Sequence, residues 1–151
     1  MTSDELRALG SLCARLDVSR VRVYRGSGGS GSPRTRWLRR LVLTLSGGRG
    51  VALGNHVFLP DREATLAVLA HELTHCAQYQ AWGPVRYYTR ALAERAREVR
   101  WRLGLGPSPY EYRSEPPRPF ESYRMEQQGQ IVEDCFRGSA RAAALSPYHP
   151  S

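Results

Sequence analysis

The chain has 151 residues, 41% of them hydrophobic, and a formal net charge of +8. This length and composition are sufficient for one buried core, so we expect a single domain over residues 1–151. Three scattered cysteines argue against a disulfide framework and against a zinc site of paired CxxC motifs. The sequence contains no run of about 18 apolar residues, so we expect no membrane partner.

The positive charge is not by itself evidence for a nucleic-acid partner. All 22 basic residues are Arg, and a single Ile accompanies abundant Ala, Leu, Gly and Val, a pattern that fits a GC-rich coding bias. The basic stretch of residues 95–102 also contains Glu98 and follows Glu94, so ion pairs along a helix can offset part of its charge. We therefore expect no nucleic-acid partner.

The first five residues include Asp4 and Glu5, whereas a secretory signal begins with basic residues followed by an apolar stretch. We expect the protein to be cytoplasmic as synthesised. Export by a route that uses no signal peptide is compatible with this expectation.

A helix is predicted at the N-terminus, because Thr2 and Glu5 have the spacing of a capping box and apolar residues follow at helical intervals up to Leu16. The alternating pattern of residues 18–24 then predicts a strand. The sequence therefore places a helix and a strand in direct succession.

The next segment is rich in glycine and serine. Residues 26–36 predict a flexible loop inside the domain, and they lack the GK[ST] element of a phosphate-binding loop. Residues 37–45 fit either a helix or a strand, whereas residues 51–59 predict a strand more strongly.

A further helix is predicted over residues 63–82, which contain neither Pro nor Gly and are followed by a Gly-Pro pair. Its apolar residues gather on one side of the helix: Leu66, Leu69, Ala70, Leu73 and Ala77. The opposite side carries His71, Glu72 and His75. A dry face and a polar face together are what a helix lining a cleft needs.

These three polar residues form an HExxH motif. In a chain of this length and composition, the probability that the motif occurs by chance is only about 0.7%. Two histidines at i and i+4 face the same way and can bind one zinc ion, with Zn–N bonds of about 2.0–2.1 Å. Glu72 is then free to act as the general base that takes a proton from a metal-activated water. His71 and His75 are the predicted ligands.

The segment after the motif predicts a helix over residues 84–103. We expect its buried side to hold the apolar residues that recur at helical spacing, namely Val85, Tyr88, Leu92, Ala96, Val99 and Leu103. The five prolines of residues 107–119 exclude a regular helix or a central strand there, and predict an ordered surface loop. We expect the tyrosines of this region, Tyr110, Tyr112 and the nearby Tyr123, to pack against proline; the alternative is that one of them donates a hydrogen bond to a tetrahedral oxyanion.

A catalytic zinc needs a third protein ligand, and the best candidate is Glu126 near the start of a helix predicted over residues 125–136. Gly129, one turn further, would let another helix approach closely. Glu133 on the same face is the second candidate, and His149 and His56 are further alternatives. The Ala-rich tail over residues 138–151 is expected to be loosely held.

The run from Leu69 to Gln80 resembles the HELTHxxQ helix of zinc metallopeptidase domains found beside extracellular contractile injection systems and polymorphic-toxin loci. The resemblance extends to residues 52–60, which are similar to the G-N-x-I-x-F strand of that family, and to residues 125–136. It implies His71 and His75 as zinc ligands, Glu72 as general base and Glu126 as third ligand. It also implies a secretion-system or toxin partner.

The chain departs from the related thermolysin-like signature, because Gln130 and not Asp lies four residues after the proposed ligand Glu126. A carboxylate that bonds to the outer nitrogen of a ligand histidine must then come from elsewhere, and Asp134 and Glu133 are the nearest options.

Together these features predict an α+β, zincin-like domain with helices on a small, mostly antiparallel sheet and the HExxH motif on a central helix. The expected function is zinc-dependent hydrolysis of a peptide or protein substrate, with an edge strand near residues 51–59 that binds the peptide. The alternative is a non-catalytic zinc-binding interaction module of a secretion or toxin system.

Overall fold

The computed structural model describes residues 1–26, 37, 40, 41, 44, 48–60 and 65–151. Within these residues the protein is a mixed α+β structure, and none of the described helices is long and apolar enough to cross a membrane. Its elements are α1 (Ser3–Ala14), η1 (Val18–Arg20), β1 (Arg22–Arg25), β2 (Val51–Leu53), β3 (His56–Leu59), α3 (Leu66–Trp82), α4 (Pro84–Arg102), η2 (Phe120–Ser122), α5 (Met125–Phe136) and α6 (Ala140–Leu145). The predictions for residues 26–36 and 37–45 lie outside the described residues, apart from Gly26 and the four isolated positions.

Among the described residues, three strands form one sheet in the order β1-β3-β2, in which β2 lies at an edge. Strand β3 pairs antiparallel with β2 but parallel with β1. The prediction of a mostly antiparallel sheet is therefore wrong, because half of the strand pairings are parallel. Parallel pairing needs a connection of about a dozen residues or more, and about thirty separate β1 from β3.

Residues 51–59 form a hairpin and not the single predicted strand. Gly54 has a φ of 63° and Asn55 has a negative φ, the pattern of a two-residue type II′ turn with glycine in its first position. The turn joins Leu53 to His56, which are partners in the antiparallel register. The strand prediction is thus correct in type and wrong in connectivity.

The predicted capping box at the N-terminus is confirmed. The hydroxyl of Thr2 accepts from the backbone N–H of Glu5, and the Glu5 carboxylate accepts from the N–H of Thr2. The strand predicted over residues 18–24 begins later, because the Asp17 side chain accepts from the N–H of Ser19 and starts the short helix η1.

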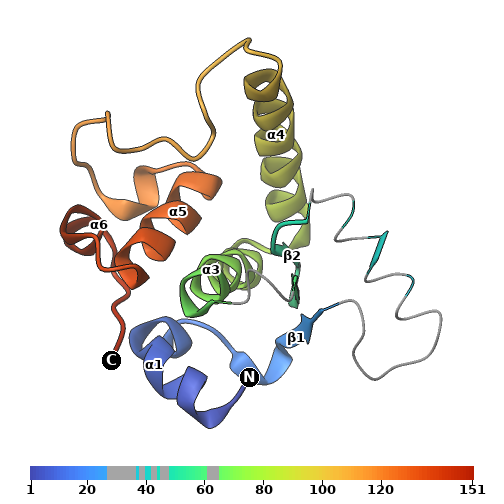
Figure 1. Ribbon diagram of the computed structural model, residues 1–151, viewed down its shortest axis with the longest axis vertical. Helices are drawn as coiled ribbons and strands as arrows, with labels where there is room; N and C mark the ends of the chain where they lie inside the picture. The colour runs from blue at the N-terminus through green and yellow to red at the C-terminus, as the bar shows by residue number, and fades with distance from the viewer. Residues whose placement is uncertain (27–36, 38–39, 42–43, 45–47, 61–64) are drawn as a thin grey trace.

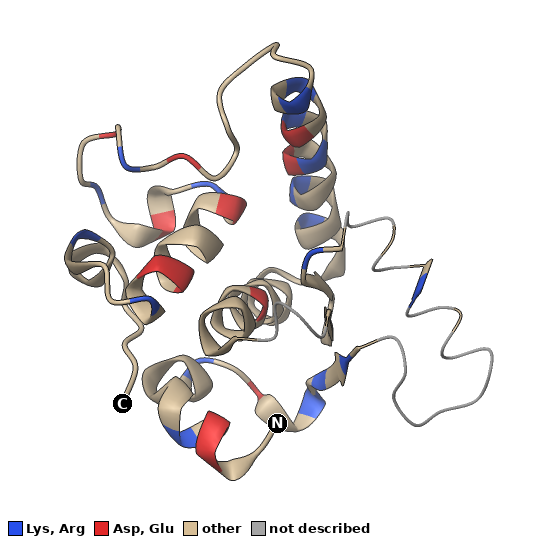
Figure 2. Cartoon of the chain, in the orientation of Figure 1, with Lys and Arg blue, Asp and Glu red and all other residues tan. Residues whose placement is uncertain are grey.

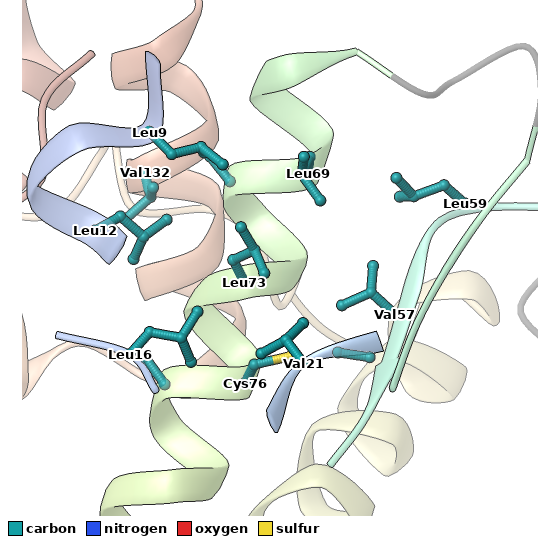
Figure 3. Packing of buried hydrophobic residues seen from close by; sticks show 13 residues of the cluster. Leu9, Leu12, Leu16, Val21, Val57, Leu59, Leu69, Leu73, Cys76 and Val132 are labelled. Carbon is teal, nitrogen blue, oxygen red and sulfur yellow. The ribbon is translucent and has the colours of Figure 1, made fainter. Parts of the chain in front are cut away.

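Helix α3 lies at the centre of the fold, with α1 and α5 on one side and the sheet on the other (Figure 1). Its aliphatic face is buried as predicted: Leu69 and Leu73 pack with Leu9 and Leu12 of α1, and Val132 of α5 joins the same cluster. Figure 3 shows these side chains around α3, with Val57 and Leu59 of β3 across the helix. Burial of this face fixes which way the opposite, polar face points.

Helix α4 confirms the predicted element but reverses its predicted orientation. Val85, Leu92 and Leu103 are 82%, 72% and 67% exposed, whereas the buried residues of the helix are Tyr87, Glu94 and Glu98. The helix projects from the body of the protein beside β2 (Figure 1). Periodicity alone identified the apolar face correctly but assigned it to the wrong side.

The C-terminal segment, predicted to be loosely held, contains helix α6 and returns to the N-terminal helix. The backbone N–H of His149 donates to the hydroxyl of Ser11, and the N–H of Ser151 donates to the carbonyl of Ala8. Ala142 is fully buried in α6. Residues 138–151 are therefore part of the described structure and pack onto it.

The orientation of α4 makes a prediction about stability. Leu92→Ala should change the free energy of unfolding by no more than about 0.5 kcal/mol, because its side chain is already in water. Leu73→Ala, which empties a fully buried site on α3, should cost about 2–5 kcal/mol. Urea denaturation of both variants measures the difference, and comparable losses would contradict an outward-facing Leu92.

Candidate metal centre

The two histidines of the HExxH motif point the same way from α3, as their spacing requires. Both are buried, and their Nε2 atoms lie 3.2 Å apart. The aliphatic side of the same helix packs into the core, so the imidazoles face away from it. The helix thus presents two ring nitrogens at one point.

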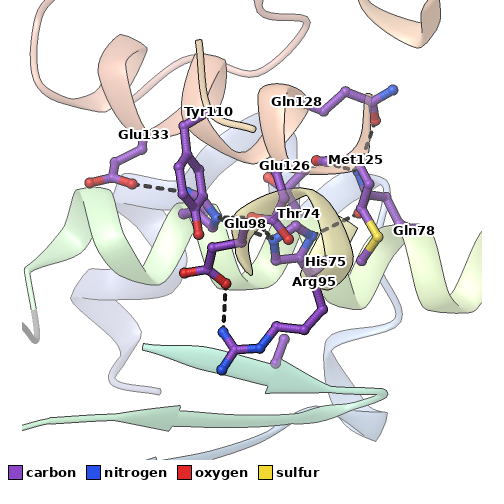
Figure 4. Close-up of polar contacts among 12 residues, drawn as sticks. Thr74, His75, Gln78, Arg95, Glu98, Tyr110, Met125, Glu126, Gln128 and Glu133 are labelled. Atoms are coloured by element: carbon purple, nitrogen blue, oxygen red, sulfur yellow. Dashed lines mark hydrogen bonds and ion pairs between the residues drawn. The ribbon is translucent and has the colours of Figure 1, made fainter. Parts of the chain in front are cut away.

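Helix α5 adds a carboxylate at that point. Oε2 of Glu126 lies 3.7 Å from Nε2 of His71 and 3.6 Å from Nε2 of His75. Among the described residues, these three form a group of potential metal ligands whose donor atoms all lie within 4.8 Å of one another. The predicted third ligand is therefore brought to the two histidines, as Figure 4 shows for His75 and Glu126.

Gly129 makes this close approach of α5 to α3 possible. A Cβ at Gly129 would lie 2.7 Å from Nε2 of His71 and 2.9 Å from its Cε1, distances that a side chain cannot occupy. The prediction that Gly129 permits close helix contact is confirmed, and the partner is a ring of the motif itself.

The outer nitrogen of His71 has a carboxylate partner. Its Nδ1 lies 2.9 Å from Oε2 of Glu133, whose other oxygen is 2.6 Å from the Arg137 guanidinium. Of the two residues considered for this role, Asp134 instead accepts from the Tyr112 hydroxyl and from Arg113. Glu133 thus lies behind His71 and not beside Glu126, where the second candidate ligand would belong.

The outer nitrogen of His75 is held by an amide that was not among the predicted site residues. Nδ1 of His75 lies 2.8 Å from Oε1 of Gln78, whose Nε2 donates to the carbonyl of Met125 and to Oε1 of Gln128. These bonds orient the amide so that its oxygen accepts from Nδ1–H of His75. The signal in the sequence is a glutamine three residues after the second histidine, in the HELTHxxQ pattern.

Electrostatics in the metal-free centre favour positive charge. Burial lowers the pKa of His71, but the nearby carboxylate of Glu126 and the hydrogen bond with Glu133 outweigh this and raise it to about 10. The pKa of His75 is also raised, because the charge of Glu126 outweighs burial. Burial raises the pKa of Glu126, but the two histidines outweigh it and hold this pKa far below its usual range. The negative charges of the carboxylates therefore favour a cation at this point.

Glu72 lies on the same cleft but outside the triangle of ligand atoms. It is buried, burial raises its pKa, and its Oε2 has no hydrogen-bond partner among the described residues. A Cβ at Gly50 would come within 3.0 Å of its Oε1, so the chain before β2 passes close to the carboxylate. Glu72 thus lies against the chain before β2, and its buried Oε2 is an unused acceptor.

A cleft of about 870 Å³ opens over the centre. Its walls come from β2, α3, α4 and α5, and include Tyr110 of the proline-rich segment. Tyr112 and Tyr123, the other candidate oxyanion donors, are buried together in a separate apolar cluster.

The alternative metal ligands lie elsewhere in the structure: His56 bonds to the Tyr24 hydroxyl, and His149 lies near Cys135.

Comparison with known families matches residues 13–83 to the model of the eCIS core domain, the core domain of extracellular contractile injection systems. The match covers just under half of the chain and includes the HExxH helix, but it ends before α5. No curated protein and no solved structure matches the chain. The association with contractile injection systems therefore rests on this one segment.

The raised pKa of His71 predicts how the stability of the metal-free protein depends on pH. Its ordinary value is 6.5 and its folded value is about 10, so the stabilisation is complete below about pH 6.5 and lost as the pH rises toward 10. Urea denaturation in the presence of a chelator should show a falling free energy of unfolding over this range. Glu133→Gln removes one hydrogen bond that raises the pKa, so its decline should be shallower; an identical decline would contradict the assignment.

Proposed function

We propose that this protein is a zinc-dependent peptide hydrolase of the gluzincin type, with His71, His75 and Glu126 as metal ligands and Glu72 as general base. The observation that carries the proposal is the triangle of three donor atoms on the wall of a cleft that also contains a buried, unpartnered Glu72 oxygen. A zincin-like fold is part of the proposal, supported by the edge strand and the ligand glutamate on a second helix.

The donor atoms fit zinc. Tetrahedral bonds of about 2.0–2.1 Å separate neighbouring ligand atoms by about 3.3–3.4 Å. The distances within the triangle are 3.2, 3.6 and 3.7 Å. Because Glu133 and Gln78 occupy the two Nδ1 atoms, the Nε2 lone pairs face the centre. Two imidazoles and one carboxylate favour zinc over magnesium or calcium, and three protein ligands are typical of catalytic zinc.

When bound, zinc would polarise the scissile carbonyl and lower the pKa of a water to about 7. Glu72 would take the proton of the attacking water on its free Oε2 and pass it to the leaving amine. In the metal-free protein, burial raises the pKa of Glu72, which favours a carboxylate that can accept a proton.

Tyr110 is the candidate donor to the developing oxyanion, because it lines the cleft and Tyr112 and Tyr123 do not. Burial raises the pKa of Tyr110, so its hydroxyl keeps the proton that such a hydrogen bond requires. Figure 4 shows its side chain reaching from the proline-rich segment toward the centre.

Strand β2 would orient the peptide. It is the outer strand of the described sheet, and its three residues line the cleft. Ala52 is one residue from the pair that closes the turn, so its backbone N–H and C=O point away from β3. The carbonyl accepts from the Tyr87 hydroxyl and keeps a second lone pair for an added strand.

The family match supports a role within a contractile injection system, so we propose a component or toxin of such a system as the partner. The substrate would be a peptide or protein that reaches the cleft in an extended conformation.

Metal binding tests the ligand set. Protein purified without a metal-affinity step should contain about one zinc per chain, and Glu126→Gln should weaken zinc binding at least about 10-fold. Glu133→Gln should also weaken binding, but it leaves the three donors in place. Replacement by cobalt(II) separates the two roles, because the visible spectrum follows the donor set.

The spectrum should change in Glu126→Gln and stay close to the parent in Glu133→Gln. Glu121→Gln removes an exposed carboxylate and is the control for net charge. The reverse pattern of spectra would make Glu133 the ligand. Less than about a tenth of an equivalent after zinc supplementation would refute the metal site, since neutral imidazole and excess zinc fill a true site.

Glu72→Gln tests the chemistry separately from the metal. The variant should keep its zinc and lose peptide hydrolysis by at least about 10²–10⁴-fold, because only the general base is removed. His75→Ala should lose both zinc and activity. Cleavage of a denatured-protein or peptide-library substrate, read by mass spectrometry, measures the loss. Full zinc occupancy with no cleavage in the parent protein would instead indicate a non-catalytic zinc-binding module.

A further inference from the structure

Helix α4 turns its acidic side toward the metal-centre cleft. Tyr87, Ala91, Glu94 and Glu98 follow one another at helical spacing and all line the cleft. Glu94 and Glu98 are only 5% and 7% exposed, while apolar residues of the same helix lie in solvent. Figure 2 shows acidic and basic residues side by side along this helix.

This arrangement is costly for stability alone. Two carboxylates at i and i+4 repel each other, and a buried carboxylate loses hydration. Burying Leu92 and Val99 in their place would gain hydrophobic free energy. Buried polar groups that a fold retains against such a cost call for an explanation, and a ligand of the cleft supplies one.

The two glutamates differ in how their charges are compensated. Both oxygens of Glu98 are paired, with Arg95 at 2.5 Å and Arg102 at 2.6 Å. Glu94 has Arg97 at 2.8 Å from Oε1, whereas its Oε2 is buried and has no hydrogen-bond partner among the described residues. Glu94 Oε2 is thus an unused acceptor in the wall of the cleft.

The other carboxylates that line the cleft are already engaged, which leaves Glu94 as the acceptor for a ligand. Glu133 is paired with Arg137 and His71, and Glu72 and Glu126 belong to the proposed metal centre. The charge of Glu126 acts on Glu94 strongly enough to contribute, after burial, to its raised pKa, so the two lie in one electrostatic environment.

We propose that Glu94 forms a subsite that binds a cationic group of the substrate, an ammonium or guanidinium, within the cleft of the metal centre. A guanidinium or ammonium would donate to Oε2 in a charge-assisted hydrogen bond and satisfy the buried acceptor. Glu98 pairs with Arg95 beside the cleft, as Figure 4 shows. Its charge is therefore already compensated by a cation of the chain itself. The substrate class is therefore a peptide with a positive charge near the scissile bond.

This subsite rests on the proposed peptide hydrolase, so its test measures binding and cleavage separately. The zinc-loaded Glu72→Gln protein is titrated with fluorescent pentapeptides that differ only in a central Arg, Lys, norleucine or Glu. Acetylated and amidated termini leave the side chain as the only charge. A further peptide with a free N-terminus and no basic side chain tests whether the cation is an α-ammonium.

The capped Arg or Lys peptide should bind at least about tenfold tighter than the norleucine peptide, the size expected of a hydrogen bond to a charged group. If the free-amine peptide alone shows this preference, the bound cation is the substrate N-terminus. Glu94→Gln in the same background should abolish the preference, and Glu121→Gln, which removes an equal charge outside the cleft, should retain it. Circular dichroism checks that each variant is folded. If Glu94→Gln does not fold, Glu94→Asp takes its place. The cation preference should then fall, because the shorter side chain withdraws the carboxylate from the cleft.

Equal affinity of the parent background for all peptides would overturn the proposal without any variant. A cation preference that survives in Glu94→Gln would also overturn it. Cleavage by the protein with Glu72 intact is then scored on the same peptides. Hydrolysis without a cation preference would refute the subsite and leave the hydrolase, whereas a cation preference in binding without any hydrolysis would refute the hydrolase and leave the subsite.

Discussion

Helix α5 meets helix α3 at Gly129, and the candidate centre depends on that contact. Any side chain there would overlap the His71 ring, so only glycine lets the backbone of α5 come this near. Glu126 lies three residues before Gly129 and Glu133 four residues after it, hence on the same face of α5. One carboxylate therefore reaches the inner nitrogens of the two histidines, and the other reaches the outer nitrogen of His71. A glycine within a helix costs about 1 kcal/mol, which the contacts it permits must offset.

The buried charges at this contact are compensated by a series of hydrogen bonds and ion pairs that extends to the protein surface. His71 bonds to Glu133, and Glu133 pairs with the half-exposed Arg137. His75 bonds to Gln78, a neutral group that is itself fixed by Gln128. Because the acidic groups outweigh burial, the pKa of both imidazoles rises, and the pocket favours positive charge before any ion enters. The same residues that stabilise the metal-free centre thus orient the donors that a metal requires.

Helix α4 turns acidic residues, and not its apolar ones, toward the cleft. Its apolar residues would normally face inward, yet the helix contributes Glu94 and Glu98 to the cleft and leaves Leu92 in solvent. Three arginines of the helix itself pair with these glutamates, so the acidic side is stabilised locally, within one turn. Hydrophobic periodicity could not have revealed this, since it records which residues share a face and not what that face contacts.

The sequence by itself determined the features that depend on neighbours along the chain. The capping box at Thr2, the helix that carries the HExxH motif and the spacing of His71 and His75 all follow from local hydrogen bonding and helical geometry. The tertiary structure decided what depends on contacts between distant segments: the position of Glu126 inside the centre with Glu133 behind it, the parallel pairing of β1 with β3, and the face that α4 turns to the cleft. Local periodicity fixes the relative directions of side chains within one element, whereas the rotation of one element against another depends on packing, which no stretch of sequence encodes alone.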